Sequence, residues 1–548
     1  MKSLFTASLL LALADAGAAT YTVTRFDDPA PGACLVNDCS LREAVNAANA
    51  NAGADRIALG EGTYQLSRPD STPDEYGSSD GALYITESID IIGISRGKTR
   101  VRWQIGQPAD RIFVVSRNDL GVRLGIAQLT VSNGSGFQGG CFYMSTINGM
   151  NRHTLALRAA VVQSCRADFG GAAYLANTDI DLQSSYVRDN SAVYDGGAFY
   201  LLGPTVVDAT GSFVESNQAD RNGGAVAIFG SGFAGWHSDV VWRDNGTGAI
   251  RYNHALGNGG AFHVNGTATL DLATDNTQPG ALLTLRENSA AGTGGAIHFK
   301  NDMTIASNRL ARLRFVDNFA QAGGALHSGY RHSISDSEFS GNWATTHGGA
   351  IFLAAVGAGT RDYQRVSFTS NRADTGSGGG IYSECVDFSA SDVSLHANAA
   401  ASGRGQAIDA LGNVTLRHVS VAGHGAQPAL RKRYSTACTG RSLRYGNSLI
   451  DGACASTLAG ELVSDGGNQL GLATIACPGL RVDQRHLLAN PFGISYANFG
   501  GDVPVLGWAA DGMVRPQRNF GLASLCTTSD GRGQPRSDGL CDAGAFEQ

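Results

Sequence analysis

The sequence is poor in lysine, in proline and in charge. Of 548 residues, 16% are charged and 13 are proline, and the 41 basic residues include just four lysines. The net charge is −7. Proteins that bind nucleic acid usually carry a basic excess or a basic stripe, so the composition argues against such a partner. The one dense basic run, Arg431–Arg433, is short, and we expect it in a solvated turn.

Long apolar runs are also scarce. No segment after the N-terminus has about 18 continuous apolar residues, which a membrane-spanning helix requires. The N-terminus itself is typical of an export signal, because Lys2 precedes the apolar run Leu4–Ala14 and small residues follow through Ala19. We therefore expect residues 1–19 to be a signal peptide and the mature protein to be secreted or held at the cell surface.

Ten cysteines fit an oxidising compartment, where an even number suggests disulfides. The sequence contains no CxxC pair, so zinc binding by cysteine has little support. Proximity along the chain favours one set among many possible pairings. These pairs are Cys34–Cys39, Cys141–Cys165, Cys385–Cys438, Cys454–Cys477 and Cys526–Cys541.

Glycine is abundant instead, with 73 residues. Much of it belongs to a repeat: Asn-x-Ala, a few residues, then Gly-Gly-Ala and an apolar residue, as in NSAVYDGGAFY from Asn190. The copies follow one another at intervals of 25 to 36 residues, and the last copy has Gly-Gln in place of the doublet. The first glycines are Gly139, Gly170, Gly196, Gly223, Gly259, Gly294, Gly323, Gly348, Gly378 and Gly405.

This spacing predicts a solenoid with short strands rather than helices, because no stretch holds a 3.6-residue period. Each coil would stack on the next at about 4.8 Å. The glycine pair would permit a tight turn of positive φ, and the recurrent asparagine would form a ladder from coil to coil. Three positions after the first glycine every residue is apolar and should face the core: Phe142, Ala173, Phe199, Val226, Phe262, Ile297, Leu326, Ile351, Ile381 and Ile408.

The next position along the strand must then face outward. It is mostly aromatic or histidine, which a solvent-facing position does not require. This outward column comprises Tyr143, Tyr174, Tyr200, Ala227, His263, His298, His327, Phe352, Tyr382 and Asp409. Two positions further lie Asn265, Lys300 and Glu384, so polar groups share this face.

Three segments resemble known families. CSLREAVNAANANAGADRIALGEGTYQL (Cys39–Leu66) resembles the CSLREA domain of secreted bacterial β-helix proteins. The repeats resemble polymorphic outer-membrane-protein repeats, with FVDN at Phe315, FSGN at Phe339 and FTSN at Phe368. SDGRGQPRSDGLCDAGAFE (Ser529–Glu547) is similar to the terminus of choice-of-anchor-Q proteins, although the stretch usual before it is missing. The resemblance implies a right-handed parallel β-helix that is exported to the cell surface or the extracellular space. It implies no particular activity.

We therefore expect an all-β protein with four regions. Residues 1–19 are the signal peptide, 20–68 an N-terminal cap, 69–425 the β-helix repeats, and 426–548 the final coils with a disulfide-tied C-terminal cap. In the N-terminal cap, Ser40 and Glu43 form a capping box that predicts a helix over 41–50. Such a helix would cover the open end of the solenoid, and we favour this capping role over a catalytic role for Arg42 or Glu43.

For function, we favour a non-catalytic protein that binds a polysaccharide or cell-surface glycan. Aromatic rings stack on sugars, so the ligand residues would be Tyr143, Tyr174, Tyr200, His263, His298, His327, Phe352 and Tyr382, with Lys300. Coverage of this column by loops, as ordinary packing, is the competing interpretation.

The alternative is a polysaccharide lyase or glycoside hydrolase, a suggestion by fold analogy. A lyase could use His263, His298, His327 or Lys300, with Arg331 and His332 further away. A hydrolase needs two carboxylates, and the repeats show no such pair in register. A third hypothesis places Zn²⁺ or Cu²⁺ between the three stacked histidines, although we expect no metal or cofactor. The oligomeric state stays open.

Overall fold

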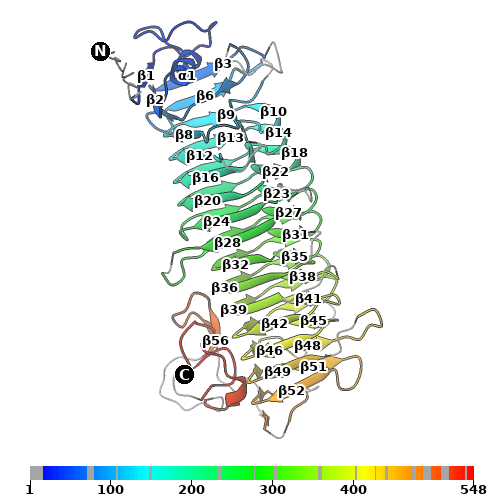
Figure 1. Ribbon diagram of the computed structural model, residues 1–548. Coiled ribbons are helices and arrows are strands. Elements are labelled where there is room, and N and C mark those ends of the chain that lie inside the picture. Colours follow the sequence, from blue (N-terminus) through cyan, green and yellow to red (C-terminus); the bar gives the residue numbers. More distant parts are fainter. Residues whose placement is uncertain are drawn as a thin grey trace, which may run out of the picture.

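The computed structural model describes residues 17–547 except for fifteen short gaps. These gaps are 71–78, 107–108, 147–150, 231–236, 277, 302–306, 356–360, 401–403, 426, 439–441, 472–476, 481, 486–494, 508–517 and 537–539. Most of the expected signal peptide therefore lies outside the described residues. The chain forms one long rod of stacked coils, from the N-terminal helix at one end to the last coils at the other (Figure 1).

One coil shows how the chain winds. β15 (Ala173–Ala176), β16 (Thr178–Gln183), β17 (Tyr186–Arg188) and β18 (Ser191–Asp195) follow one another around the rod. A residue of positive φ stands at each corner: Asn177 at 51°, Ser184 at 49° and Asp189 at 54°. Such φ values are uncommon outside glycine, so each corner is a sharp bend rather than a loop.

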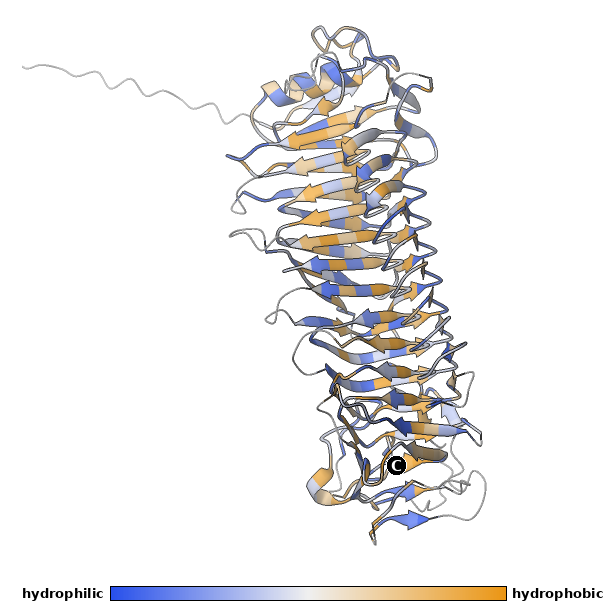
Figure 2. Ribbon diagram, turned by 90° about the vertical axis from the view of Figure 1, so that its right-hand side faces the viewer, coloured by the Kyte–Doolittle hydropathy of each residue, from blue (hydrophilic) through white to orange (hydrophobic). Residues whose placement is uncertain are grey.

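The strands pair in parallel with the equivalent strands of the coils before and after. They form sheets of 30, 14 and 10 strands, and the larger sheet bends at the β16–β17 corner and its equivalents. The antiparallel hairpin of β55 (Ser495–Ala497) and β56 (Val505–Gly507) stands apart. One continuous apolar core runs from the N-terminal helix to the last coils, and Figure 2 shows apolar residues recurring on strands of successive coils. The predicted fold class, a parallel β-helix, is confirmed.

The glycine doublets act as the repeat predicts. At all ten positions the first glycine has a φ between 58° and 74°. The second glycine is needed for a different reason: a Cβ on Gly295, for example, would clash with the backbone oxygen of Gly324 in the next coil. The predicted inward column is buried throughout.

The predicted asparagine ladder is also present. Each Nδ2 donates to the Oδ1 of the next asparagine at 2.9–3.1 Å. Each Nδ2 also donates to a backbone oxygen of the preceding coil, as from Asn318 to Leu285 at 2.9 Å. The members are Asn190, Asn217, Asn253, Asn288, Asn318, Asn342, Asn371 and Asn398. Because every amide is buried and bonded, the ladder fixes the register of the coils.

The N-terminal helix α1 (Leu41–Ala50) begins at the predicted capping box. Ser40 N–H donates to Glu43 Oε2 at 2.7 Å, and Glu43 N–H donates to Ser40 Oγ at 3.3 Å. Arg42 is fully buried and forms two hydrogen bonds with Asp28, at 2.8 and 2.9 Å. Arg42 and Glu43 thus hold the cap together through contacts with its own residues.

Five disulfides join the cysteines in the predicted pairs. The C-terminal segment, which we define as residues 495–547, does more than close the end of the rod. It folds back along one side of the lower coils (Figure 1), where Leu506 N–H donates to Ser394 Oγ and Ala545 N–H to Ser420 Oγ, both at 2.9 Å. The final coils supply the end of the rod, including β48 (Pro428–Lys432) and β52 (Leu462–Gly466).

Candidate functional site

The outward column lies in register on the 14-stranded sheet, as the sequence predicts. Its rings stack on one another with centroid separations between 4.7 and 5.6 Å, as in the steps from Tyr143 to Tyr174 and from His298 to His327. Within each run of rings along the rod axis, the next ring covers most ring faces, although Ala227 interrupts the column between Tyr200 and His263 and the three histidine rings are tilted against one another. Mainly ring edges remain for a ligand, whereas a sugar stacks on a ring face.

Neighbouring side chains also cover much of the column. Phe169 packs edge-on against Tyr200 at 5.4 Å, and His347 lies over Tyr382 at 4.4 Å. His263 is 4% exposed and His298 is 7% exposed. Lys300, in contrast, is exposed. The saccharide-binding role of the column stays a prediction, and the stacked and partly covered geometry gives it little free surface.

The three column histidines are neutral at pH 7. Burial lowers the pKa of His263 and of His327 to about 4, and it lowers the pKa of His298 well below its usual value. One ring nitrogen of His298 is bonded to Thr293 Oγ1 at 2.8 Å, while Nδ1 of His263 and of His327 has no hydrogen-bond partner. Neutral imidazoles could accept a proton, but these lie under the surface rather than in an open groove.

The two more distant lyase candidates, Arg331 and His332, differ in their exposure to solvent. His332 is 2% exposed, and its Nε2 is hydrogen-bonded to the Tyr363 hydroxyl at 3.1 Å. Burial lowers the pKa of His332 to about 3. Arg331 is exposed, so the two residues do not form one reactive pair.

The basic run Arg431–Arg433 is not the solvated turn that the sequence suggests. Arg431 and Arg433 both pair with Asp409, which is fully buried at the end of the outward column. Lys432 points the other way, and its Nζ donates to the backbone oxygens of Leu411 and Arg433 at 2.8 and 2.9 Å. The expectation was wrong because it could not include Asp409, which lies in the preceding coil.

A groove of about 430 Å³ lies on the bent 30-stranded sheet. We call it the arginine groove. It lies over β6 (Thr99–Trp103), β9 (Thr130–Ser132), β13 (Val161–Gln163) and β17, and its lining includes Arg96, Arg100, Arg188, Gln163 and Tyr186. The lining contains no carboxylate, although the chain as a whole is acidic.

The groove has an ordered wall. The Tyr186 ring stacks on Phe213 of β21 (Phe213–Glu215), with centroids 5.1 Å apart. The Arg96 guanidinium lies 4.8 Å from the centre of the Tyr186 ring, and Arg251 lies 4.8 Å from that of Phe213. Arg188 donates to Gln163 Oε1 at 3.1 and 3.3 Å. These contacts hold the guanidinium groups in place, which reduces the entropy lost when they bind a ligand.

A second groove, of about 360 Å³, lies across the bend on the other arm of the same sheet. It covers β2 (Asp55–Leu59), β5 (Ile89–Ile92), β8 (Arg123–Ala127) and β12 (His153–Arg158). Its charged lining residues are Arg56, Arg123, Arg158 and Asp90. Arg123 pairs with Asp90, and Arg158 pairs with Asp181 at 3.1 Å.

Neither groove was found from the sequence. The arginines are scattered over several coils and follow no repeat, so only the stacking of the coils brings them together. The one usable signal was the predominance of arginine over lysine, which says nothing about position.

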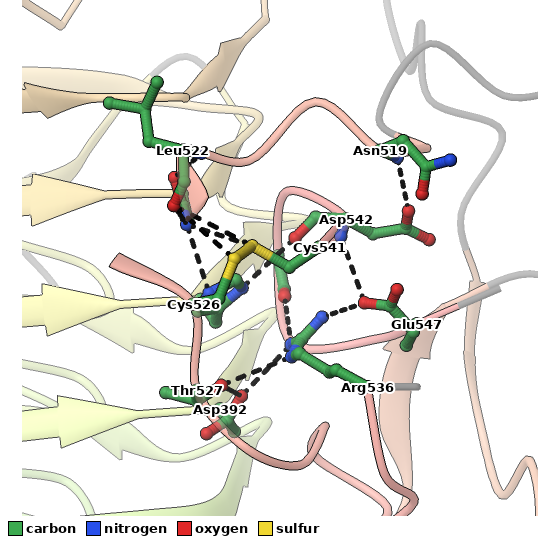
Figure 3. The surroundings of a disulfide bond; sticks show 12 residues. Asp392, Asn519, Leu522, Cys526, Thr527, Arg536, Cys541, Asp542 and Glu547 are labelled. Carbon is green, nitrogen blue, oxygen red and sulfur yellow. Dashed lines mark hydrogen bonds and ion pairs between the residues drawn. A yellow bond between two sulfur atoms is a disulfide. The ribbon is translucent and has the colours of Figure 1, made fainter. Parts of the chain in front are cut away.

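The described residues contain one group of three side chains with the geometry of a metal site: His418, Cys526 and Cys541. The two sulfur atoms form a disulfide, so no thiolate is available to bind a metal. This disulfide and the hydrogen bonds around it hold the C-terminal segment in place (Figure 3). Asn447 Nδ2 lies 3.3 Å from both the Cys541 sulfur and His418 Nε2. Among the described residues, His263, His298 and His327 do not form such a group.

Two comparisons with known proteins found similarities to this chain. The Chlamydia polymorphic membrane protein repeat matches residues 336–354 and 365–384, which confirms the resemblance of the repeats. The crystal structure of the catalytic unit of a GH87 α-1,3-glucanase from Streptomyces thermodiastaticus strain HF3-3 is 14% identical, with a TM-score of 0.39. That match covers 80% of this chain and 66% of the glucanase chain, just under two thirds. The resemblance of the two termini to the CSLREA and choice-of-anchor-Q families stays a prediction.

No curated protein matches the chain significantly. Among the described residues, no helix has the length and apolar character needed to cross a membrane.

Proposed function

We propose that the protein is a non-catalytic, exported protein that binds an extracellular polysaccharide, with the arginine groove as its binding site. The observation that carries this proposal is the groove itself, in which Arg96, Arg100 and Arg188 line an open surface without a carboxylate. Guanidinium groups form paired hydrogen bonds with carboxylates, sulfates and hydroxyl-rich ligands, and the rigid coils hold them at fixed spacing.

The lining of the grooves favours binding over hydrolysis. A glycosidase requires two carboxyl groups facing one bond. The arginine groove has none among its lining residues, and the second groove has only Asp90, which is paired with Arg123. The histidines proposed for a lyase, three in the outward column and His332 on β36 (His332–Ser340), line neither groove.

Export is supported by the five disulfides, because such bonds persist in oxidising compartments. Location at the cell surface is also typical of proteins that carry the matched repeat. Within that setting, a long rigid rod with a lateral groove is suited to contact an extended polymer.

The test is binding of the full chain to immobilised polysaccharides, followed by calorimetry. We expect at least one of dextran, polygalacturonate and sulfated dextran to bind without being degraded. Arg188→Gln should weaken binding about tenfold, because a charged hydrogen bond is lost, while Arg417→Gln, exposed on β46 (Val414–Arg417), should leave it unchanged.

Absence of binding to all three polymers would contradict the proposal. Release of unsaturated or reducing ends during incubation would contradict its non-catalytic part. The Tyr174→Ala variant tests the earlier hypothesis: if it abolishes binding while Arg188→Gln does not, the outward column is the site.

A further inference from the structure

The two grooves are neighbours within the same coils. The chain passes from β8 in the second groove to β9 in the arginine groove through Gln128 and Leu129, and from β12 to β13 through Ala159 and Ala160. Gln128 and Ala159, with φ of 56° and 48°, form the bend. Both line the second groove, while Thr130 and Val161, two residues further, line the arginine groove. Only this narrow bend separates the two surfaces.

The charges of the two grooves have the same sign. Six arginines and one aspartate line them together. Among the described residues, Arg56, Arg96 and Arg100 are exposed and form no ion pair, so the second groove offers one cation without an acidic partner and the arginine groove offers two. Arg96, in the loop after β5, lies beside the bend and donates to Ser184 O at 3.0 Å. An excess of fixed cations in a protein of net charge −7 points to an anionic ligand.

The aromatic geometry distinguishes between polyanions. Single-stranded nucleic acid usually stacks its bases on free aromatic faces. Tyr186, the aromatic ring in the groove lining, has Phe213 of the next coil against it, and Arg96 approaches from the N-terminal side. No ring face is left for a base, whereas the guanidinium groups and the Tyr186 hydroxyl can bind acidic groups and hydroxyls of a sugar chain.

We propose that the two grooves form one continuous site for an acidic polysaccharide, whose carboxylate or sulfate groups pair with the arginines on both sides of the bend. This inference rests on the proposed saccharide-binding function and adds the ligand class and the extent of the site. The bound polysaccharide would cross the bend next to Arg96, with Arg100 on one side of the bend and Arg56 on the other.

The charge requirement is tested with two polymers of the same backbone. Polygalacturonate and its fully methyl-esterified form share one sugar backbone, and the methyl ester removes the charge of each carboxylate. Binding of each polymer to the full-length protein is measured by calorimetry at two salt concentrations. We expect the acidic polymer to bind at least tenfold more tightly and to weaken with salt. Equal binding of the two polymers would overturn the acidic class and leave the proposed function standing, whereas binding of neither, nor of dextran or sulfated dextran, would remove both.

The extent of the site is tested with a galacturonate trimer and dodecamer. Arg56→Gln and Arg100→Gln remove unpaired cations, and Arg417→Gln is the matched control on a distant coil. We expect both groove variants to weaken dodecamer binding about tenfold, but only one of them to affect the trimer. An unaltered dodecamer affinity for Arg56→Gln would overturn the continuous site, and an equal loss for Arg417→Gln would overturn its location.

Two further measurements keep these outcomes interpretable. The thermal unfolding midpoints of the variants should equal that of the wild type, since the substituted side chains are exposed. Binding of a DNA duplex as tight as that of polygalacturonate, with the same dependence on Arg100, would overturn the assignment to a polysaccharide.

Discussion

Individual glycines and asparagines set the spacing of the coils. The first glycine of a doublet turns the chain at positive φ, and the second leaves room for the backbone oxygen of the next coil. The buried asparagines then saturate one another's amides along the rod. At this scale a substitution acts on two neighbouring coils at once.

Gly295→Ala should destabilise the protein by about 3 kcal/mol or more, because its Cβ would clash with backbone that cannot move without shifting the next coil. Urea unfolding measures the effect. The control is Gly60→Ala, an exposed position where the added methyl group meets only ordinary contacts and should change stability by less than about 0.5 kcal/mol. Equal effects of the two variants would contradict the explanation.

Asn318→Ala should destabilise by about 2–4 kcal/mol, because it leaves buried partners on Asn288, Asn342 and Leu285 without their hydrogen bonds. The same unfolding assay applies. Gln321→Ala, which changes an exposed side chain in the same coil, should have almost no effect. A neutral Asn318→Ala variant would show that the ladder does not stabilise the fold.

For the outward column, the sequence predicts which way the side chains point but not what covers them. The alternation of the strand predicts its direction correctly, and the register brings all ten residues together. Its coverage depends on residues before the doublets, such as Phe169, Thr293 and His347. These follow no pattern, so the sequence could not decide between a ligand platform and a packed stack.

At the scale of elements, α1 and the C-terminal segment differ in how they are specified. A capping box four residues long marks where the helix begins, so a local pattern predicts its N-terminus. The C-terminal segment docks onto serines of three different coils, including Ser394 and Ser420. No sequence pattern identifies those serines as docking residues, because their partners lie more than a hundred residues away.

Arg536 anchors this segment and provides a test. It is 2% exposed at its side chain, bonds Asp392 at 3.1 Å and also pairs with Glu547 (Figure 3). Arg536→Ala should leave two buried carboxylates unpaired and weaken docking by about 3–5 kcal/mol. Limited proteolysis should then cleave the C-terminal segment while the coils stay intact, and the exposed Arg518→Ala should behave as wild type. Unchanged protease resistance would contradict the anchoring role.

At the scale of the whole molecule, buried histidines link stability to pH. Burial lowers the pKa to about 4 for His263 and His327, and to about 3 for His332, His418 and His424. The unfolded chain binds these protons below about pH 6.5, and the folded chain does not. Their contribution is therefore complete above pH 6.5 and is lost as the pH falls towards 4.

Buried carboxyls oppose this trend. Burial raises the pKa of Asp244 and of Asp392 to about 6, and it also raises the pKa of several other carboxyls, such as Asp110 and Asp409. The folded state then binds these protons more tightly, so stability is gained as the pH falls from about 6 to about 4. Because five histidines have large pKa shifts and only two carboxyls do, we expect a net loss of a few kcal/mol between pH 7 and pH 5, measured by urea unfolding at each pH.

His327→Phe identifies the source of this dependence. The ring would still stack between His298 and Phe352, but no proton could be gained on unfolding, so the pH dependence should become shallower. The exposed His237→Gln serves as control and should leave it unchanged. An identical dependence in the wild type and both variants would contradict the assignment.

Local and repeating patterns in the sequence are enough to specify the coil: the turn glycines, the asparagine ladder, the inward and outward directions of the strands and the start of the capping helix. The glycines and asparagines repeat because each coil meets the same neighbours. Proximity favours four of the disulfides, while Cys385–Cys438, 53 residues apart, is the pair that remains. What lies on the surface depends instead on how the coils stack. The two arginine-lined grooves, the burial of Asp409 beneath the basic run and the docking of the C-terminal segment join residues that no period relates, since stacking places side chains from distant coils next to one another.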